Sequence, residues 1–116
     1  MSASSLQRWR SELQAGRASL IQAYQARPHA TRLLTGLARL ADRVLADIWN
    51  AHNLPGQAAL IAVGGYGRGE LYPQSDVDLL LLLPDELPQS EVTRFEPLVA
   101  LFWDVGLPIG HSVRTL

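Results

Sequence analysis

Two carboxylates placed two residues apart carry the clearest chemical potential of this chain. Asp76 and Asp78 stand at the start of the apolar run Val77–Leu83. Because strand side chains alternate between faces, both carboxylates are expected on the same side of a strand. Mg²⁺ binds proteins through one or two carboxylates together with substrate phosphates and water, and Mn²⁺ accepts the same oxygen donors. The pair therefore predicts a divalent-metal site for a phosphate-bearing substrate.

A glycine-rich segment precedes this pair and predicts a phosphate site. Gly64 and Gly65 directly follow the short apolar run 58–63. Without side chains, they allow phosphate oxygens to approach backbone N–H groups, assisted by a short helix that we expect to begin near Tyr66. Taken separately, such glycines usually form a tight turn, and two acids near a strand end are usually just solvated. Their combination, with Ser75 beside the acids, favours a joint metal and phosphate site.

Composition excludes several other chemistries. The chain contains no lysine and no cysteine, which excludes a Walker A loop, a disulfide framework, a thiolate metal site and a cysteine nucleophile. From Gly64 the glycines read Gly-x-x-Gly-x-Gly, which is not the dinucleotide-binding order. Ser75 lies beside carboxylates and His111 beside no acid, so the sequence supports no Ser/His nucleophile pair.

The hydrophobic periodicity predicts the elements that must position these residues. Two amphipathic helices are expected over 5–27 and 31–51, and a buried strand over 58–63. Val77–Leu83 is apolar on both faces, which predicts a central strand covered on both sides. A helical pattern covers residues 90–105, and Pro97 within it favours a helix start near that residue. A strand is expected over 108–113. The inward positions predicted for the three helices are Leu6, Trp9, Leu13, Leu20, Tyr24, Leu33, Leu37, Leu40, Val44, Ile48, Val92, Phe95, Leu98, Val99, Phe102 and Trp103.

This order predicts an α+β (α/β-like) fold in which residues 1–54 form a helical segment and residues 55–116 a partial core with a short mixed sheet. The charged residues are also distributed unevenly between the first and the second part of the chain. Residues 1–69 hold eight arginines against three acids, and residues 70–116 hold two arginines against eight acids. A basic part followed by an acidic part suits a site where cations and an anionic ligand meet, although solvated helix faces give the same balance.

Size and hydropathy limit the class of protein further. At 116 residues and 12.7 kDa, the chain has room for one domain or part of one. Its longest aliphatic run, Leu79–Leu83, is far shorter than the ~20 residues of a membrane span. The first residues contain no continuous apolar segment of the kind found in secretory signals. We therefore expect a cytoplasmic protein with neither a membrane nor a nucleic acid as its partner.

At these residues the sequence resembles a known family. Gly64-Gly65, the spacer and Asp76-x-Asp78 resemble the signature of the polymerase-β-like nucleotidyltransferase superfamily. The fuller string GGYGRGELYPQSDVDLLLL, followed by WDVGLPIGHSVRTL at 103–116, is similar to the amino-terminal part of the bacterial PII uridylyltransferase/uridylyl-removing enzyme family. The resemblance is strong over residues 58–116, and the two N-terminal helices are compatible with it.

The resemblance implies a Mg²⁺-dependent transfer of UMP from UTP to a tyrosine of the PII nitrogen-regulatory protein, carried out by a truncated nucleotidyltransferase core. Asp76 and Asp78 would then be catalytic metal ligands, and Gly64 and Gly65 would hold the triphosphate. Ser75 would be a further phosphate contact. Arg68 would be another, unless it forms a surface ion pair with Glu70. Tyr66 and Tyr72 are interpreted as packing residues.

The sequence departs from the family pattern at one point that bears on catalysis. The superfamily uses a third carboxylate on a neighbouring strand, and the strand expected over 108–113 contains no acid. Asp104 precedes that strand at a helix end. We therefore expect the third carboxylate, the hydrolase domain and the glutamine-sensing domains beyond Leu116, so that the chain is an inactive fragment. The alternatives are another superfamily member, disfavoured by the ending GHSVRTL, or a non-catalytic module that binds a nucleotide or a protein.

Overall fold

The computed structural model describes residues 3–52, 58–73, 75–84 and 89–115. Their secondary structure runs in the order α1 (Ala3–Ala26), α2 (Ala30–Ala51), β1 (Ala59–Ala62), α3 (Gly64–Gly67), β2 (Val77–Leu83), α4 (Gln89–Val92), the 3₁₀ turn η1 (Thr93–Phe95), α5 (Glu96–Val105) and β3 (Ile109–Thr115). This arrangement confirms the α+β fold class. Each helix and strand expected from periodicity is present, with α5 starting next to Pro97 as expected.

The three strands form a mixed sheet in the order β1-β2-β3, with β2 in the centre. β1 pairs antiparallel with β2, placing Ile61 opposite Leu80. β2 pairs parallel with β3, placing Asp78 opposite Gly110. A parallel pair needs a crossover connection, and α4, η1 and α5 lie in the connection between these two strands. The short mixed sheet predicted for the core is therefore confirmed.

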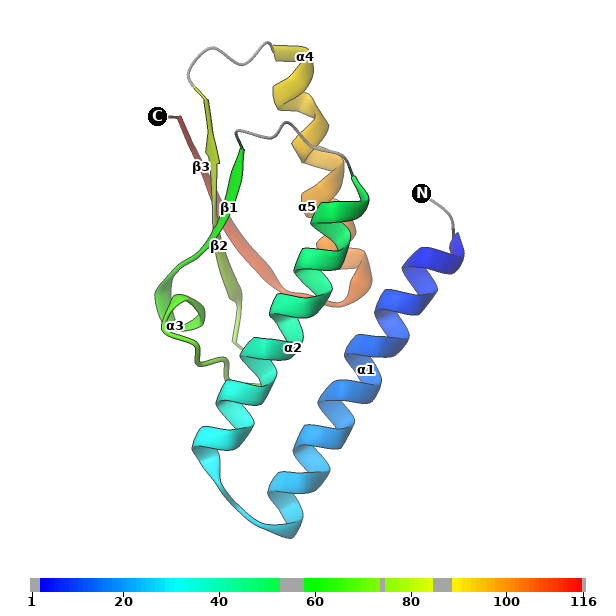
Figure 1. The fold of residues 1–116 in the computed structure, drawn as a ribbon, viewed down its shortest axis with the longest axis vertical. Helices are drawn as coiled ribbons and strands as arrows, with labels where there is room; N and C mark the ends of the chain where they lie inside the picture. The colour runs from blue at the N-terminus through cyan, green and yellow to red at the C-terminus, as the bar shows by residue number, and fades with distance from the viewer. Residues whose placement is uncertain (1–2, 53–57, 74, 85–88, 116) are drawn as a thin grey trace.

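The helices cover one face of this sheet, as Figure 1 shows for α2 and α5. Val77, Leu79, Leu81 and Leu83 of β2 are buried against them, whereas the alternate positions are only half-buried. The prediction that β2 is covered on both faces is therefore wrong for the described part of the chain. Two apolar faces on a strand show that it is central, but they do not show that a second layer is present.

The helical pair and the sheet share a single hydrophobic cluster. Trp9 and Leu13 of α1, Val44 and Ile48 of α2, and Phe102 of α5 are all at most 2% exposed and belong to the same core as β2. The division into segments 1–54 and 55–116 remains a prediction of the sequence. In the structure, the two segments are packed together rather than separated.

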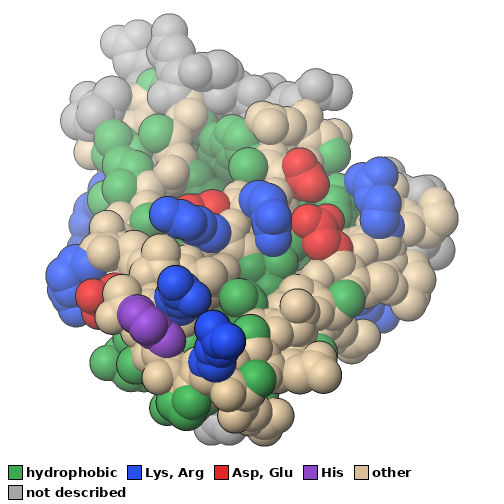
Figure 2. All heavy atoms as spheres, turned by 60° about the horizontal axis from the view of Figure 1, so that its bottom comes forward, with side chains coloured by type: hydrophobic (Ala, Val, Ile, Leu, Met, Phe, Trp, Pro, Cys, Tyr) green, Lys and Arg blue, Asp and Glu red, His purple; other side chains and the backbone are tan. Residues whose placement is uncertain are grey.

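The connected ends of α1 and α2 extend beyond the sheet (Figure 1). Residues 21–32 are exposed throughout, so Tyr24, predicted to point inward, is 37% exposed. The prediction that Trp103 points inward is also wrong, because this residue of α5 is 55% exposed. Figure 2 turns this end forward and shows several arginine side chains over it. Within the described residues, no helix has the combined length and hydropathy that a bilayer crossing requires.

Candidate active site

The glycine segment forms a tight helical turn directly after β1. Val63 extends the pairing with β2, since its N–H donates to the Asp78 carbonyl at 3.0 Å. Gly64 then reverses the chain with a φ of +61°, a conformation that glycine adopts readily and other residues disfavour. The N–H of Gly67 donates to the Val63 carbonyl at 2.8 Å. The short helix therefore begins at Gly64, earlier than the expected start near Tyr66.

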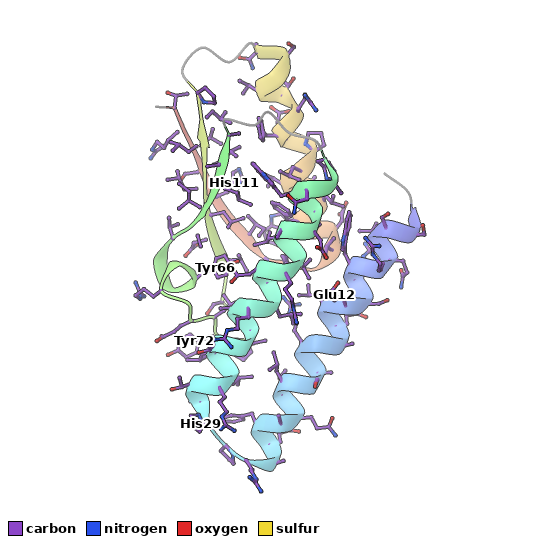
Figure 3. All side chains as sticks on the ribbon, in the orientation of Figure 1. Glu12, His29, Tyr66, Tyr72 and His111 are labelled. Carbon is purple, nitrogen blue, oxygen red and sulfur yellow. The ribbon has the colours of Figure 1, made fainter. Side chains whose placement is uncertain are left out.

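Tyr66 ties this turn to α2. Its side chain is 6% exposed, and its hydroxyl donates a hydrogen bond to Asp42 Oδ1. Burial, then the hydrogen bond and charge of Asp42, raise the pKa of the Tyr66 hydroxyl above its ordinary value. A second link follows where the N–H of Leu71 donates to the Leu34 carbonyl at 3.1 Å. The packing role predicted for Tyr66 is confirmed, and Figure 3 shows this residue between α3 and α2. The two hydrogen bonds hold the segment 66–71 against α2.

A pocket of about 270 Å³ opens beside this turn. It is lined by Gly65, Tyr66, Glu70, Leu71, Tyr72, Ser75, Asp76 and Asp78. Four residues predicted for the site, namely Gly65, Ser75, Asp76 and Asp78, thus face one hollow. Asp76 is exposed one residue before β2, and Asp78 is half-buried within it. The expectation that both carboxylates face one side agrees with this shared lining.

The other two predicted residues lie next to the pocket. A Cβ built on Gly64 would come within 2.9 Å of Asp78 Oδ2, so this glycine borders the carboxylate itself. The guanidinium of Arg68 is exposed, with its Nη2 atom 3.6 Å from the position of a Cβ on Gly65. Arg68 and Glu70 are both described, and no ion pair joins them. The guanidinium is therefore beside the glycine turn and is not held by Glu70.

Two residues near the carboxylates were missed or misread from the sequence. Tyr72 lines the pocket with 60% of its surface exposed, so the packing role predicted for it is wrong. Gly110 of β3 lies against Asp78, since a Cβ there would come within 2.8 Å of Asp78 Oδ1. The signal for Gly110 was present in the sequence as a glycine inside a strand, but its partner depends on the strand pairing.

Comparison with known proteins agrees with this geometry. Residues 43–105 match the family model described as a nucleotidyltransferase domain. The chain belongs to the nucleotidyltransferase domain family. The matched segment contains α3, β2 and all six residues predicted for the site. The segment that matches the family model therefore includes the elements that build the pocket.

Curated relatives place the chain nearer to one branch of the nucleotidyltransferases. It is 49% identical over 116 residues to the bifunctional uridylyltransferase/uridylyl-removing enzyme of Chromobacterium violaceum, covering 100% of this chain and 14% of that protein. The proteins with the same name from Nitrosospira multiformis and Bordetella parapertussis are 47% and 50% identical, over 92% and 90% of this chain and 13% and 12% of their own lengths. No solved structure matched the chain. The chain thus spans a small part of the relatives that it resembles.

The oxygen donors that line this pocket fit a hard divalent cation. Asp76 and Asp78 offer carboxylate oxygens to one pocket, and bare glycines border the Asp78 carboxylate. Among the described residues, no group of three or more His, Asp or Glu side chains is placed to hold a metal. Asp104 does not join the pair. It lies at the end of α5, where its backbone carbonyl accepts a hydrogen bond of 2.6 Å from Arg10 Nε.

Proposed function

We propose that this chain carries the nucleotide-binding and metal-binding part of an enzyme that transfers UMP from UTP to a tyrosine hydroxyl of the PII protein. The observation that carries the proposal is the single pocket that collects Gly65, Ser75, Asp76 and Asp78. The uridylyltransferase activity in the name of the relatives supports the uridylyl group. The PII protein and UTP come from the resemblance of the segments 64–82 and 103–116 to that family.

Each residue has a role that its position supports. Asp76 and Asp78 would hold Mg²⁺ or Mn²⁺, which supplies positive charge to the triphosphate and to the departing pyrophosphate. The N–H groups of Gly64 and Gly65 belong to the first turn of α3, where a helix offers them no internal acceptor. They are free to donate to phosphate oxygens. Ser75 lines the pocket and would donate its hydroxyl to the same phosphates.

The position of Arg68 supports a contact with the outer part of the triphosphate. Its guanidinium is exposed beside Gly65, with no ion pair to Glu70 to hold it back. A planar guanidinium binds phosphate oxygens in pairs. UTP and Mg²⁺ are available in the cytoplasm, which is where we place the enzyme.

The test is metal-dependent nucleotide binding by the 116-residue chain. Calorimetry with UTP in Mn²⁺ or Mg²⁺ should show binding that disappears when the metal is removed. Asp78→Asn should abolish it, since the amide keeps the shape but removes the charged ligand, while Asp47→Asn on the exposed side of α2 serves as the matched control. Binding that is equally strong in Asp78→Asn and in the unchanged chain would contradict the proposal.

One observation favours a second candidate for the chain by itself. Glu70 also lines the pocket, but among the described residues no group of three or more Asp, Glu or His side chains is placed to hold a metal. This arrangement suits nucleotide binding without turnover. A different superfamily member would show itself in the same assay. Tighter binding of ATP, GTP or CTP than of UTP would favour that alternative over a uridylyltransferase.

A further inference from the structure

The carboxylate of Asp78 lies between two glycines that come from different elements. Gly64 belongs to α3, on the β1 side of the sheet, and Gly110 belongs to β3, on the opposite side of β2. Asp78 and Gly110 are paired residues of the parallel ladder, so their side chains project from the same face. That face is the one not covered by α2 and α5 (Figure 1). The carboxylate therefore stands in a gap bordered by backbone on both sides.

Each carboxylate oxygen faces one of these glycines. A Cβ on Gly110 would lie 2.8 Å from Asp78 Oδ1, and a Cβ on Gly64 would lie 2.9 Å from Asp78 Oδ2. Both distances are shorter than the closest contacts that Cβ atoms make. A side chain at either position therefore cannot coexist with the present orientation of the carboxylate.

The conformation of Gly110 does not explain why a glycine stands there. The glycines with positive φ in the described residues are Gly64, Gly69 and Gly106, and Gly110 lies in the regular strand β3. Any residue can adopt that backbone, and a glycine inside a strand weakens it and marks a close approach. At Gly110 the close approach is that of Asp78 Oδ1.

We propose that Gly110 is a positioning residue for Asp78, and that together with Gly64 it sets the direction in which this carboxylate meets the pocket. β3 thus contributes to the site because Gly110 has no side chain and leaves room for the Asp78 carboxylate. From the sequence, the only feature noted for this strand was that it contains no acid. The part of the proposal that concerns metal binding rests on the proposed function. The part that concerns the orientation of Asp78 does not.

The experiment compares Gly110→Ala with Ser112→Ala in the 116-residue chain. Ser112 is the next residue of β3 on the same face and pairs with Leu80, so its variant controls for a general change of the strand. NMR couplings of the Asp78 β-protons report its χ1 rotamer without any metal. Gly110→Ala should change that rotamer, and Ser112→Ala should not.

Binding provides the second readout. Gly110→Ala should raise the dissociation constant of the Mn²⁺–UTP complex by about tenfold or more, the usual effect of displacing the support of a metal ligand. Ser112→Ala should leave it within about twofold of the unchanged chain. If the unchanged chain fails to bind Mn²⁺–UTP, the proposed function fails, and the rotamer measurement still tests the positioning role.

A double variant keeps the test decisive where Gly110→Ala is poorly folded. In the Asp78→Ala background the carboxylate is absent, so Gly110→Ala should fold as well as its parent. Recovery of folding there supports the proposal, because the clash with Asp78 is then the cause of the damage. Equal loss of folding in both backgrounds, or an unchanged Asp78 rotamer together with unchanged binding in Gly110→Ala, would overturn it.

Discussion

The hydroxyl of Tyr66 donates a hydrogen bond to Asp42 Oδ1 and so joins the glycine turn of the site to helix α2. Tyr66 is buried on α3, and Asp42 is on the exposed side of α2. Both residues also line a hollow between α2 and β1. The turn that carries Gly64 and Gly65 is therefore held in place by a contact with a helix distant in the sequence (Figure 3).

We predict that Tyr66→Phe lowers the free energy of unfolding by about 1 kcal/mol, the usual value of one hydrogen bond whose acceptor stays solvated. It should also weaken UTP binding, because the glycine turn loses an anchor. Denaturant unfolding and calorimetry measure the two effects. Tyr24→Phe is the control, since Tyr24 is 37% exposed on α1 and does not line the pocket. Equal behaviour of the two variants would remove the anchoring role.

Because of Tyr66, we also predict that the free energy of unfolding depends on pH in the alkaline range. The pKa of Tyr66 is raised in the folded chain, so folding favours the protonated hydroxyl. Its stabilisation is complete below the unfolded tyrosine pKa of about 10 and is lost as the pH rises toward the higher folded pKa, with a slope of up to about 1.4 kcal/mol per pH unit. Tyr66→Phe should reduce this slope when unfolding is measured between pH 9 and pH 11. An unchanged slope would refute the prediction.

The two neighbouring glycines of α3 should respond differently to a side chain. At Gly65 a Cβ would make ordinary contacts, at 3.6 Å from Arg68 Nη2 and 3.7 Å from the Glu70 carbonyl. We expect Gly65→Ala to keep its thermal stability and to lose UTP affinity, since the methyl group would stand where phosphate oxygens approach. Gly65→Val should weaken nucleotide binding more strongly.

Gly64→Ala should instead lose stability directly. Its φ of +61° costs a residue with a side chain roughly 1–2 kcal/mol, and the new Cβ would press on Asp78 Oδ2. Thermal unfolding and UTP titration of both alanine variants separate the two effects. If Gly65→Ala unfolds as readily as Gly64→Ala, the phosphate role of Gly65 loses its support.

The 116-residue chain should bind UTP with Mg²⁺ and transfer no UMP, since no three Asp, Glu or His side chains of its described residues are placed to hold a metal together. Incubation with labelled UTP, Mg²⁺ and the PII protein measures this. A longer chain that adds a further helix and strand with one more acid should label PII. Labelling by the 116-residue chain would contradict the prediction, and Asp104→Asn would then be the first variant to examine.

The sequence by itself determined the elements and the local part of the site. Apolar spacing is a property of each segment, so the helices and strands were predictable to within two residues, and the bounds of β2, Val77–Leu83, were predicted without error. Gly65, Ser75, Asp76 and Asp78 were also predictable as one site. They lie on a short stretch of chain between two paired strands, and such a stretch has little freedom to separate them.

Tertiary structure decided what lies against these residues. The apolar pattern of a segment reports which faces avoid water, but it does not report which element covers them, and so the half-exposed face of β2 and the exposed Tyr24, Tyr72 and Trp103 could not be foreseen. The contacts of Asp78 with Gly110 and of Tyr66 with Asp42 depend on strand register and helix packing. Those depend on how the whole core fills its space, because a shift of one residue in the pairing would turn a different side chain toward the pocket.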